Sequence, residues 1–325
     1  MSPEQKNESI ELKFWGVRGS IPSPPTKEEI EGKIISIAKE VMSSGFDNEE
    51  SVERFVRELP VHRSGLIGGN TSCVYINIAG NHIILDAGSG MRRLSNFLMK
   101  EEFGSGEGTA HIFLSHTHWD HIMGFPFFTP AYTAGNTIIV YGAHTAMEQR
   151  ISNQQEDEYF PVSLSSMGAN IDFKQLRKGD VTSINGIAIT NKMLNHPGGS
   201  FGYRIDYGGK SVVYATDSEY KDLRENVIDK YIDFFKDADV LIFDAQFTLT
   251  ESIEKENWGH STSSVGVDLA ITANVKHLIL FHHDPEYSDG KLADILENAV
   301  LYSKLKSSSN NLKVSLAYEG MELSV

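Results

Sequence analysis

The sequence has little cysteine, no long apolar run and fewer basic than acidic residues. Cys73 is the single cysteine, so no disulfide can form within the chain. No apolar run approaches the roughly 20 residues that a membrane-spanning helix needs. The N-terminus is polar and shows no signal segment. Together these absences predict a cytoplasmic protein without a membrane partner.

Positive charge is scarce as well. The chain carries 29 Lys and Arg against 44 Asp and Glu, which gives a formal net charge of −15. This charge opposes nonspecific binding to nucleic acid, so nucleic acid is expected to be an unlikely partner. Bound divalent metals would still create a local positive site for an anion. The 325 residues suffice for one large α/β domain.

A helical insertion is expected near the N-terminus. Thr26 is followed three positions later by a glutamate, which is the spacing of a capping box, and apolar residues then recur at helical spacing. Gly45 is expected to end this helix, and Pro60 to end a second one. Residues 26–60 thus form a helical hairpin inserted into one domain spanning residues 1–325. It would pack on the core as a surface insertion, or act as a lid or a dimer contact.

The other segments alternate between strand and helix patterns. This order favours two mixed sheets with helices on both outer faces over one parallel sheet. Strands are expected near 12–17, 73–78, 82–86, 110–115, 137–141, 171–176, 186–195, 201–207, 211–215, 240–244, 277–282 and 312–317. Helices are expected near 90–100, 145–151, 221–236, 263–273 and 290–304.

The strongest chemical signal is a cluster of imidazoles and one carboxylate after the strand expected at 110–115. Four metal-ligand side chains lie within six positions: His116, His118, Asp120 and His121. Imidazole suits zinc, iron, manganese or copper, and a carboxylate adds a hard oxygen ligand. The alternative is a histidine-rich loop that binds no metal.

Three further strands also end in ligand-type residues, which makes the metal interpretation much stronger. His196, Asp217 and His282 each follow an apolar run almost directly. A single histidine after a strand is usually structural. Several such strand ends converge when they share one edge of a sandwich, so the sequence predicts a joint metal site.

The order and spacing of these motifs resemble the metallo-β-lactamase superfamily along nearly the whole chain. The resemblance implies an α/β fold, an αββα four-layer sandwich of two mixed β-sheets flanked by helices, with a dinuclear site on one edge. It places one metal on His116, His118 and His196, the other on Asp120, His121 and His282, and Asp217 between them. The two ions would be zinc, manganese or iron, with zinc favoured.

One ligand is ambiguous, because His283 could replace His282. Side chains alternate between the two faces of a strand, and His282 follows the apolar run directly, so His282 is preferred. A water bridging the two metals would lose a proton and attack phosphorus or a carbonyl carbon.

Residues 257–262 resemble the histidine motif of the RNase Z branch. This likeness makes His260 a general acid that protonates the leaving alkoxide, and Asp120 and His260 are the candidate catalytic residues. The alternative is that His260 caps the following helix. Ser261 in the same motif is a candidate substrate contact.

The chain also departs from the tRNA enzymes of that branch. Only one short hairpin separates His196 from Asp217, so the long tRNA-gripping arm of those enzymes is absent. Residues 14–20, 68–73 and 86–90 resemble bacterial members of the branch that act as metal-dependent hydrolases or cyclic-nucleotide phosphodiesterases, and homodimers are usual there.

These features favour a dinuclear metal-dependent hydrolase of small phosphodiesters, most of all a cyclic-nucleotide phosphodiesterase. Phe127 or Phe128 would stack on a base or pack in the core. The alternatives are a lactone or ester hydrolase on the same site, an RNA-processing nuclease of the RNase Z type, and a cyclic-nucleotide binding protein without catalysis.

Overall fold

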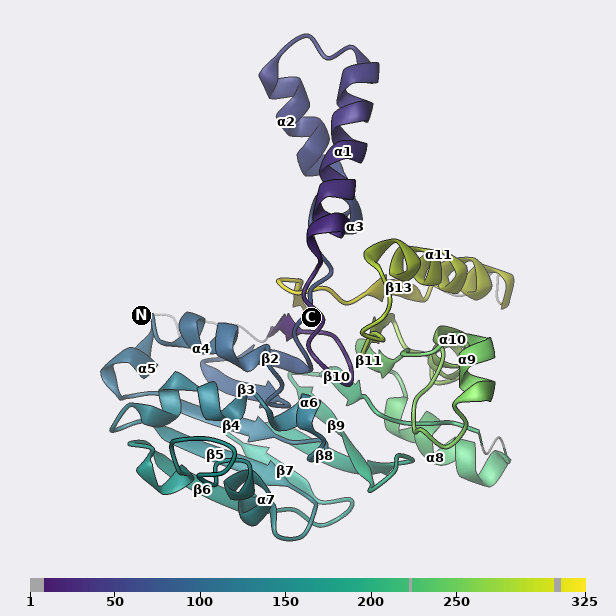
Figure 1. Ribbon diagram of the computed structural model, residues 1–325. Helices are drawn as coiled ribbons and strands as arrows, with labels where there is room; N and C mark the ends of the chain where they lie inside the picture. The colour runs from purple at the N-terminus through teal and green to yellow at the C-terminus, as the bar shows by residue number, and fades with distance from the viewer. Residues whose placement is uncertain (1–8, 222–223, 307–310) are drawn as a thin grey trace, which may run out of the picture.

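A computed structural model describes residues 9–221, 224–306 and 311–325. Two seven-stranded mixed sheets pack face to face with helices outside them, which confirms the predicted αββα sandwich (Figure 1). The polar lead before residue 9 and part of the start of the helix expected at 221–236 fall outside the described residues. No described helix is both long and apolar enough to cross a membrane.

The first sheet is antiparallel at one side and parallel at the other. Its order is β14 (Glu322–Ser324), β1 (Ile10–Gly16), β2 (Cys73–Ile78), β3 (Asn81–Leu85), β4 (Thr109–Phe113), β5 (Thr137–Gly142) and β6 (Asn170–Gln175). Strands β3 to β6 run parallel. The carboxyl ends of β3 and β4 therefore open at the same edge of this sheet.

The second sheet repeats this mixture. Its order is β13 (Lys313–Leu316), β12 (His277–Phe281), β11 (Val240–Asp244), β10 (Lys210–Ala215), β9 (Ser200–Tyr207), β8 (Ile187–Leu194) and β7 (Val181–Ile184). Strands β10 to β13 run parallel, and β7 to β10 form antiparallel hairpins. The single β9–β10 hairpin lies between His196 and Asp217, where the sequence predicts no tRNA-gripping arm.

Helices flank the sheets, and the longer ones lie where they are expected. They are α4 (Met91–Leu98), α5 (Glu102–Ser105), α6 (Trp119–Ile122), α7 (Met147–Asn153), α8 (Glu225–Phe235), α9 (Leu249–Glu254), α10 (Ser263–Thr272) and α11 (Asp289–Lys306). Short 3-10 turns cover Phe125–Phe127, Thr129–Tyr132 and Leu164–Ser166. The sequence analysis missed α5, α6, α9, β7 and β14, all six residues or shorter, because so few positions show little periodicity.

Two apolar clusters hold the sandwich together. The larger contains the inward residues of both sheets, such as Phe14 of β1 and Phe281 of β12, whose ring centroids lie 6.1 Å apart. The smaller packs the outer face of the first sheet against its helices and turns, with Phe103, Leu94 and Phe128 fully buried. The burial of each such side chain stabilises the folded protein by about 1.5–3 kcal/mol. The core therefore gives the strand ends a rigid support.

The insertion forms α1 (Lys27–Ser44), α2 (Glu49–Glu58) and the short α3 (Val61–Ser64), of which α3 was not expected. The capping box at Thr26 and the helix end at Gly45, where φ is +66°, are confirmed. Neither α1 nor α2 buries a residue, and the hairpin projects from the sandwich (Figure 1). The expectation that it packs on the core is wrong: α1 and α2 bury no side chain, and the hairpin meets the sandwich at its base, where α3 contacts α11.

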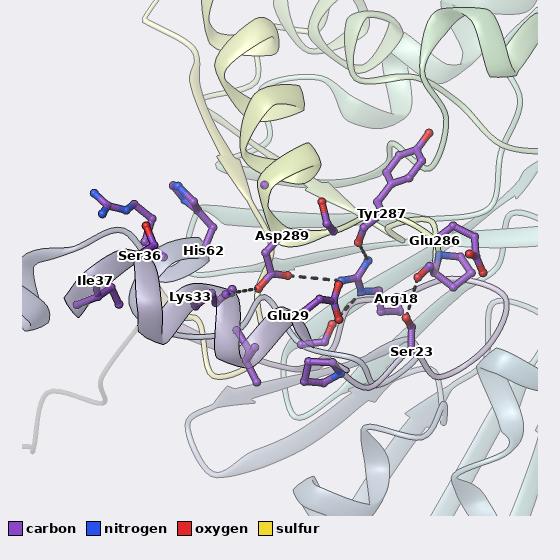
Figure 2. Close-up of a pocket in the computed structure, with 18 residues that line it drawn as sticks. Arg18, Ser23, Glu29, Lys33, Ser36, Ile37, His62, Glu286, Tyr287 and Asp289 are labelled. Carbon is purple, nitrogen blue, oxygen red and sulfur yellow. Dashed lines mark hydrogen bonds and ion pairs between the residues drawn. The ribbon is translucent and has the colours of Figure 1, made fainter. Parts of the chain in front are cut away.

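A cavity of about 410 Å³ lies at the base of this hairpin. Figure 2 shows Asp289 between Lys33 and Arg18 beside it. The Lys33 ammonium lies 2.5 Å from one Asp289 oxygen, and the Arg18 guanidinium lies 3.6 Å from the other. Arg18 also donates to the carbonyls of Gly68, Asp284 and Tyr287. These contacts join the hairpin to the sandwich through buried, paired charges.

Candidate metal centre

The candidate site lies where strands of both sheets end. His116 follows β4, His196 follows β8, Asp217 follows β10 and His282 follows β12. Asp217 and His282 have φ of +54° and +61°, and Asp86 after β3 has +60°. Residues other than glycine rarely adopt this left-handed backbone conformation, and it is found in tight turns at functional sites. The sharp turns bring residues from distant parts of the chain to one point.

One group of donors consists of three histidines. His116, His118 and His196 each offer a ring nitrogen, and these atoms lie within 4.8 Å of one another. His196 Nε2 lies 3.1 Å from His118 Nδ1. Two ligand atoms on a tetrahedral ion at about 2.0–2.1 Å are separated by roughly 3.3 Å. The spacing therefore fits one metal ion.

The second group mixes histidines and carboxylates. Asp120, His121, Asp217 and His282 are all buried, and their donor atoms lie within 4.8 Å of one another. Asp120 Oδ2 lies 3.2 Å from the Nε2 atoms of both His121 and His282. These distances also fit the ligand spacing around one ion.

Asp217 lies between the two groups. Its Oδ1 is 3.3 Å from the Nε2 atoms of His121 and His282. Its Oδ2 is 3.8 Å from the Nε2 atoms of His116 and His196. One oxygen thus faces each group, as a carboxylate bridging two ions requires.

Buried partners orient the histidines. Asp86 accepts hydrogen bonds from His121 Nδ1, Tyr214 and both polar groups of Ser115. Ser115 in turn accepts from His116 Nδ1. Each ring therefore directs its Nε2 into the site, the arrangement usual for metal-binding histidines. His116 Nε2 is buried without a hydrogen-bond partner, which favours a metal ligand over a structural histidine.

In the group of three histidines, the protonation states suit metal binding. Burial lowers the pKa of His116, His118 and His196, which keeps them in the neutral form that binds metals. Burial alone would raise the pKa of Asp217, but the adjacent imidazoles of His121 and His282 hold it well below its usual value. The site thus presents three neutral imidazoles and an ionised central carboxylate.

The structure separates His282 from His283. His282 Nε2 points at Asp120 and Asp217, whereas His283 Nε2 donates to the carbonyl of Ala317, 2.9 Å away. Neighbouring side chains thus take opposite directions, as the preference for His282 assumed.

His260 stands beside the second group and is held by a carboxylate that the sequence analysis did not single out. His260 Nδ1 donates to Asp244 Oδ2 over 2.7 Å, and the same carboxylate accepts from the backbone of Asp217. Asp244 and Asp86 are carboxylates at strand ends, so the signal that found Asp217 would have found both. His260 lies before the N-cap Thr262 of α10, so it does not cap that helix.

The N-terminal loop closes one side of the site. The backbone nitrogen of Ser20 donates to Asp120 Oδ2 over 2.7 Å. A Cβ on Gly19 would lie 2.4 Å from the His282 ring, so only glycine fits there. The likeness at residues 14–20 thus corresponds to a segment that supports the ligands.

A pocket of about 380 Å³ opens on these residues. It is lined by Ser20, Thr117, His118, Trp119, Asp120, Asp217, His260 and His282. Three expected substrate contacts lie outside this lining. Phe128 is fully buried in the core, so its assignment as a base contact is wrong.

The other two have partners within the protein. Phe127 packs its ring against Phe160 at 5.4 Å. Ser261 is buried and donates to the carbonyl of Ser218, so its hydroxyl is used in holding the loop before α10. Sequence reasoning missed Trp119, because an aromatic residue between ligands has no distinctive pattern.

Fold and donor set define the class: a metallo-β-lactamase-fold hydrolase with a potential metal site. The chain belongs to the family described as the beta-lactamase superfamily domain, whose model matches residues 81–283.

Curated relatives include ribonuclease Z from Oceanobacillus iheyensis, 23% identical over 261 residues that cover 61% of this chain and 83% of that protein. Ribonuclease Z from Bacillus thuringiensis is 25% identical over 260 residues, which cover 61% of this chain and 82% of that protein. These relatives agree with the predicted likeness to the RNase Z branch. These relatives do not support the expectation that nucleic acid is an unlikely partner.

Solved structures show the same fold. The metallo-beta-lactamase fold protein YhfI from Bacillus subtilis has a TM-score of 0.64 at 18% identity, covering 98% of this chain and 100% of that one. Unliganded yeast PDE1 has a TM-score of 0.63 at 12% identity, and the match covers 97% of this chain and 99% of that one. The short form of human tRNase Z has a TM-score of 0.59 at 16% identity, and the match covers 96% of this chain and 98% of that one.

Proposed function

We propose that this protein is a dinuclear metal-dependent phosphodiesterase of small substrates, with cyclic nucleotides foremost. The observation that carries the proposal is the position of Asp217, which turns one oxygen toward each group of donors. Two divalent ions held there would supply an acidified water as nucleophile and positive charge for the phosphate. The pocket of about 380 Å³ matches the size of sites for small molecules.

The protein's own residues would orient and protonate the substrate. Asp244 accepts from His260 Nδ1, which leaves Nε2 at the pocket to carry a proton for the leaving alkoxide. Asp120 is held by the Ser20 backbone and stays directed at His121 and His282.

The decisive experiment is hydrolysis of 2′,3′- and 3′,5′-cyclic nucleotides by metal-loaded protein, with His260→Ala beside it. The variant is expected to lose about 10²–10⁴-fold in turnover while its metal content stays unchanged. His62→Ala, a histidine at the hairpin cavity, is the matched control and should retain turnover. Hydrolysis of lactones or thioesters without any phosphodiester activity would contradict the proposal.

RNA processing is the second candidate, and the ribonuclease Z relatives favour it. The single short β9–β10 hairpin and the net charge of −15 argue for small substrates instead. A tRNA precursor added to the cyclic-nucleotide assay distinguishes the two. Cleavage of the precursor with competitive inhibition of the small substrate would favour the nuclease.

Finer points of the sequence analysis stay predictions. Zinc is the metal we expect, and elemental analysis of the purified protein measures it. A homodimer is expected in solution, and the projecting hairpin is a candidate contact or lid. The cytoplasm is the location that we propose.

A further inference from the structure

Trp119 is a large apolar side chain in an unusual place. It stands between the candidate ligands His118 and Asp120, as the first residue of α6, and it lines the pocket. Its side chain is nevertheless 79% exposed. Because both neighbours turn into the site, the backbone at residue 119 is firmly positioned while the indole stands at the rim.

The exposure of Trp119 differs from that of the other tryptophans. Trp15 packs on Phe97 at 5.5 Å, and Lys255 lies over the Trp258 ring at 5.7 Å. Within the described residues, the Trp119 ring enters no aromatic pair and no cation contact. Single exposed apolar residues are common on protein surfaces. An unpartnered indole at the mouth of a polar pocket, however, presents a flat apolar face to whatever binds there.

We propose that Trp119 is the platform on which the base of a nucleotide-type substrate stacks while the phosphate lies among the histidines and carboxylates. This inference rests on the proposed function and adds the substrate class that the site selects. Aromatic side chains stack on any base, because every base has a π face. Trp119 thereby takes the role that Phe128, which is buried, and Phe127, which lies outside the pocket lining, do not fill.

The proposal predicts selectivity for substrates that carry a base. The experiment compares a cyclic nucleotide with the same cyclic phosphate of methyl riboside, in which a methoxy group replaces the base. Trp119→Ala should lower the ratio of kcat/KM for the two substrates by about 5- to 150-fold, mainly through KM. Trp119→Phe should keep most of the ratio, because it retains an aromatic face.

The matched control is Tyr159→Ala, which removes an aromatic ring that is 80% exposed and lies outside the pocket lining. Its ratio should equal that of the wild type. An unchanged ratio in Trp119→Ala overturns the inference and leaves the phosphodiesterase proposal intact. A fall in Trp258→Ala without one in Trp119→Ala also overturns it.

A second measurement does not depend on turnover. A nucleoside monophosphate that stacks on Trp119 should quench tryptophan fluorescence in the wild type, and ribose phosphate should not. Trp119→Phe should abolish this quenching. Persistence of the quenching in the variant overturns the inference. Base-dependent quenching without hydrolysis of any diester would support the platform and contradict the phosphodiesterase proposal, so the two failures are distinguishable.

Discussion

Two hollows of this molecule contain charged or polar side chains, and they differ in whether those side chains have partners within the protein. In the hairpin cavity, Arg18, Lys33 and Asp289 satisfy one another (Figure 2). In the metal centre, the ligand atom His116 Nε2 is buried without a hydrogen-bond partner. Unpaired buried polar atoms cost about 1–3 kcal/mol each unless a ligand takes them up. The first hollow is a structural joint, and the second is arranged for binding.

Asp217 and Asp289 make this comparison testable, because each is a carboxylate at the centre of its cluster. Asp217→Asn should lower kcat/KM on a cyclic nucleotide by more than about 100-fold and reduce the bound metal. The reason is the loss of the negative charge that both groups of ligands share. Elemental analysis and hydrolysis measure the two effects. A variant with full metal content and full activity would contradict the bridging role.

The same substitution at the hairpin cavity should have the opposite result. Asp289→Asn leaves Arg18 and Lys33 without their carboxylate and should cost about 1.5–3 kcal/mol, because Lys33 is partly exposed and Arg18 keeps its backbone acceptors. Denaturant unfolding measures the loss, and limited proteolysis should cleave within residues 26–66 sooner. Metal content should stay as in the wild type. A loss of metal in this variant would break the distinction between the two hollows.

Strand β12 extends the comparison, because it begins at His277 and leads to His282. Burial, and next the charge of Lys313, lowers the pKa of His277 to about 4. In the unfolded chain, the same imidazole takes up a proton near pH 6.5. The folded state's advantage from keeping His277 neutral is therefore complete above that pH and is lost as the pH falls toward 4. The loss is at most about 3 kcal/mol. Unfolding of the wild type and His277→Gln between pH 7 and 4 measures it, and parallel curves would contradict it.

The smallest expected effect is on the stability of α1 in the projecting hairpin. The hydroxyl of Thr26 accepts from the backbone of Glu29, and the Glu29 side chain accepts from the backbone of Thr26. Thr26→Ala should therefore cost about 1 kcal/mol of helix stability. Hydrogen exchange in α1 measures it, with Thr262→Ala at the N-cap of α10 as the matched control. Faster exchange in the sandwich instead would show that the hairpin is not independent.

Local patterns predicted most of the elements and the candidate ligands. The Thr26 capping box, the helix end at Gly45 and the apolar runs before His196 and His282 depend on neighbours in the chain alone. Short elements such as β7 and β14 escaped, because three or four residues cannot display a period. The strand-end signal also marks Asp86 and Asp244, but their roles as positioning residues are not visible in the sequence, because their partners lie far away along the chain.

The sequence by itself determined which chemical groups stand at the strand ends, because ligand types and strand periodicity are local properties. Tertiary structure decided which of those groups converge. It directed His282 into the site and His283 to a backbone carbonyl, and it buried Phe128 while exposing Trp119. These outcomes depend on the packing of two sheets whose strands are distant along the chain, so no local pattern contains them.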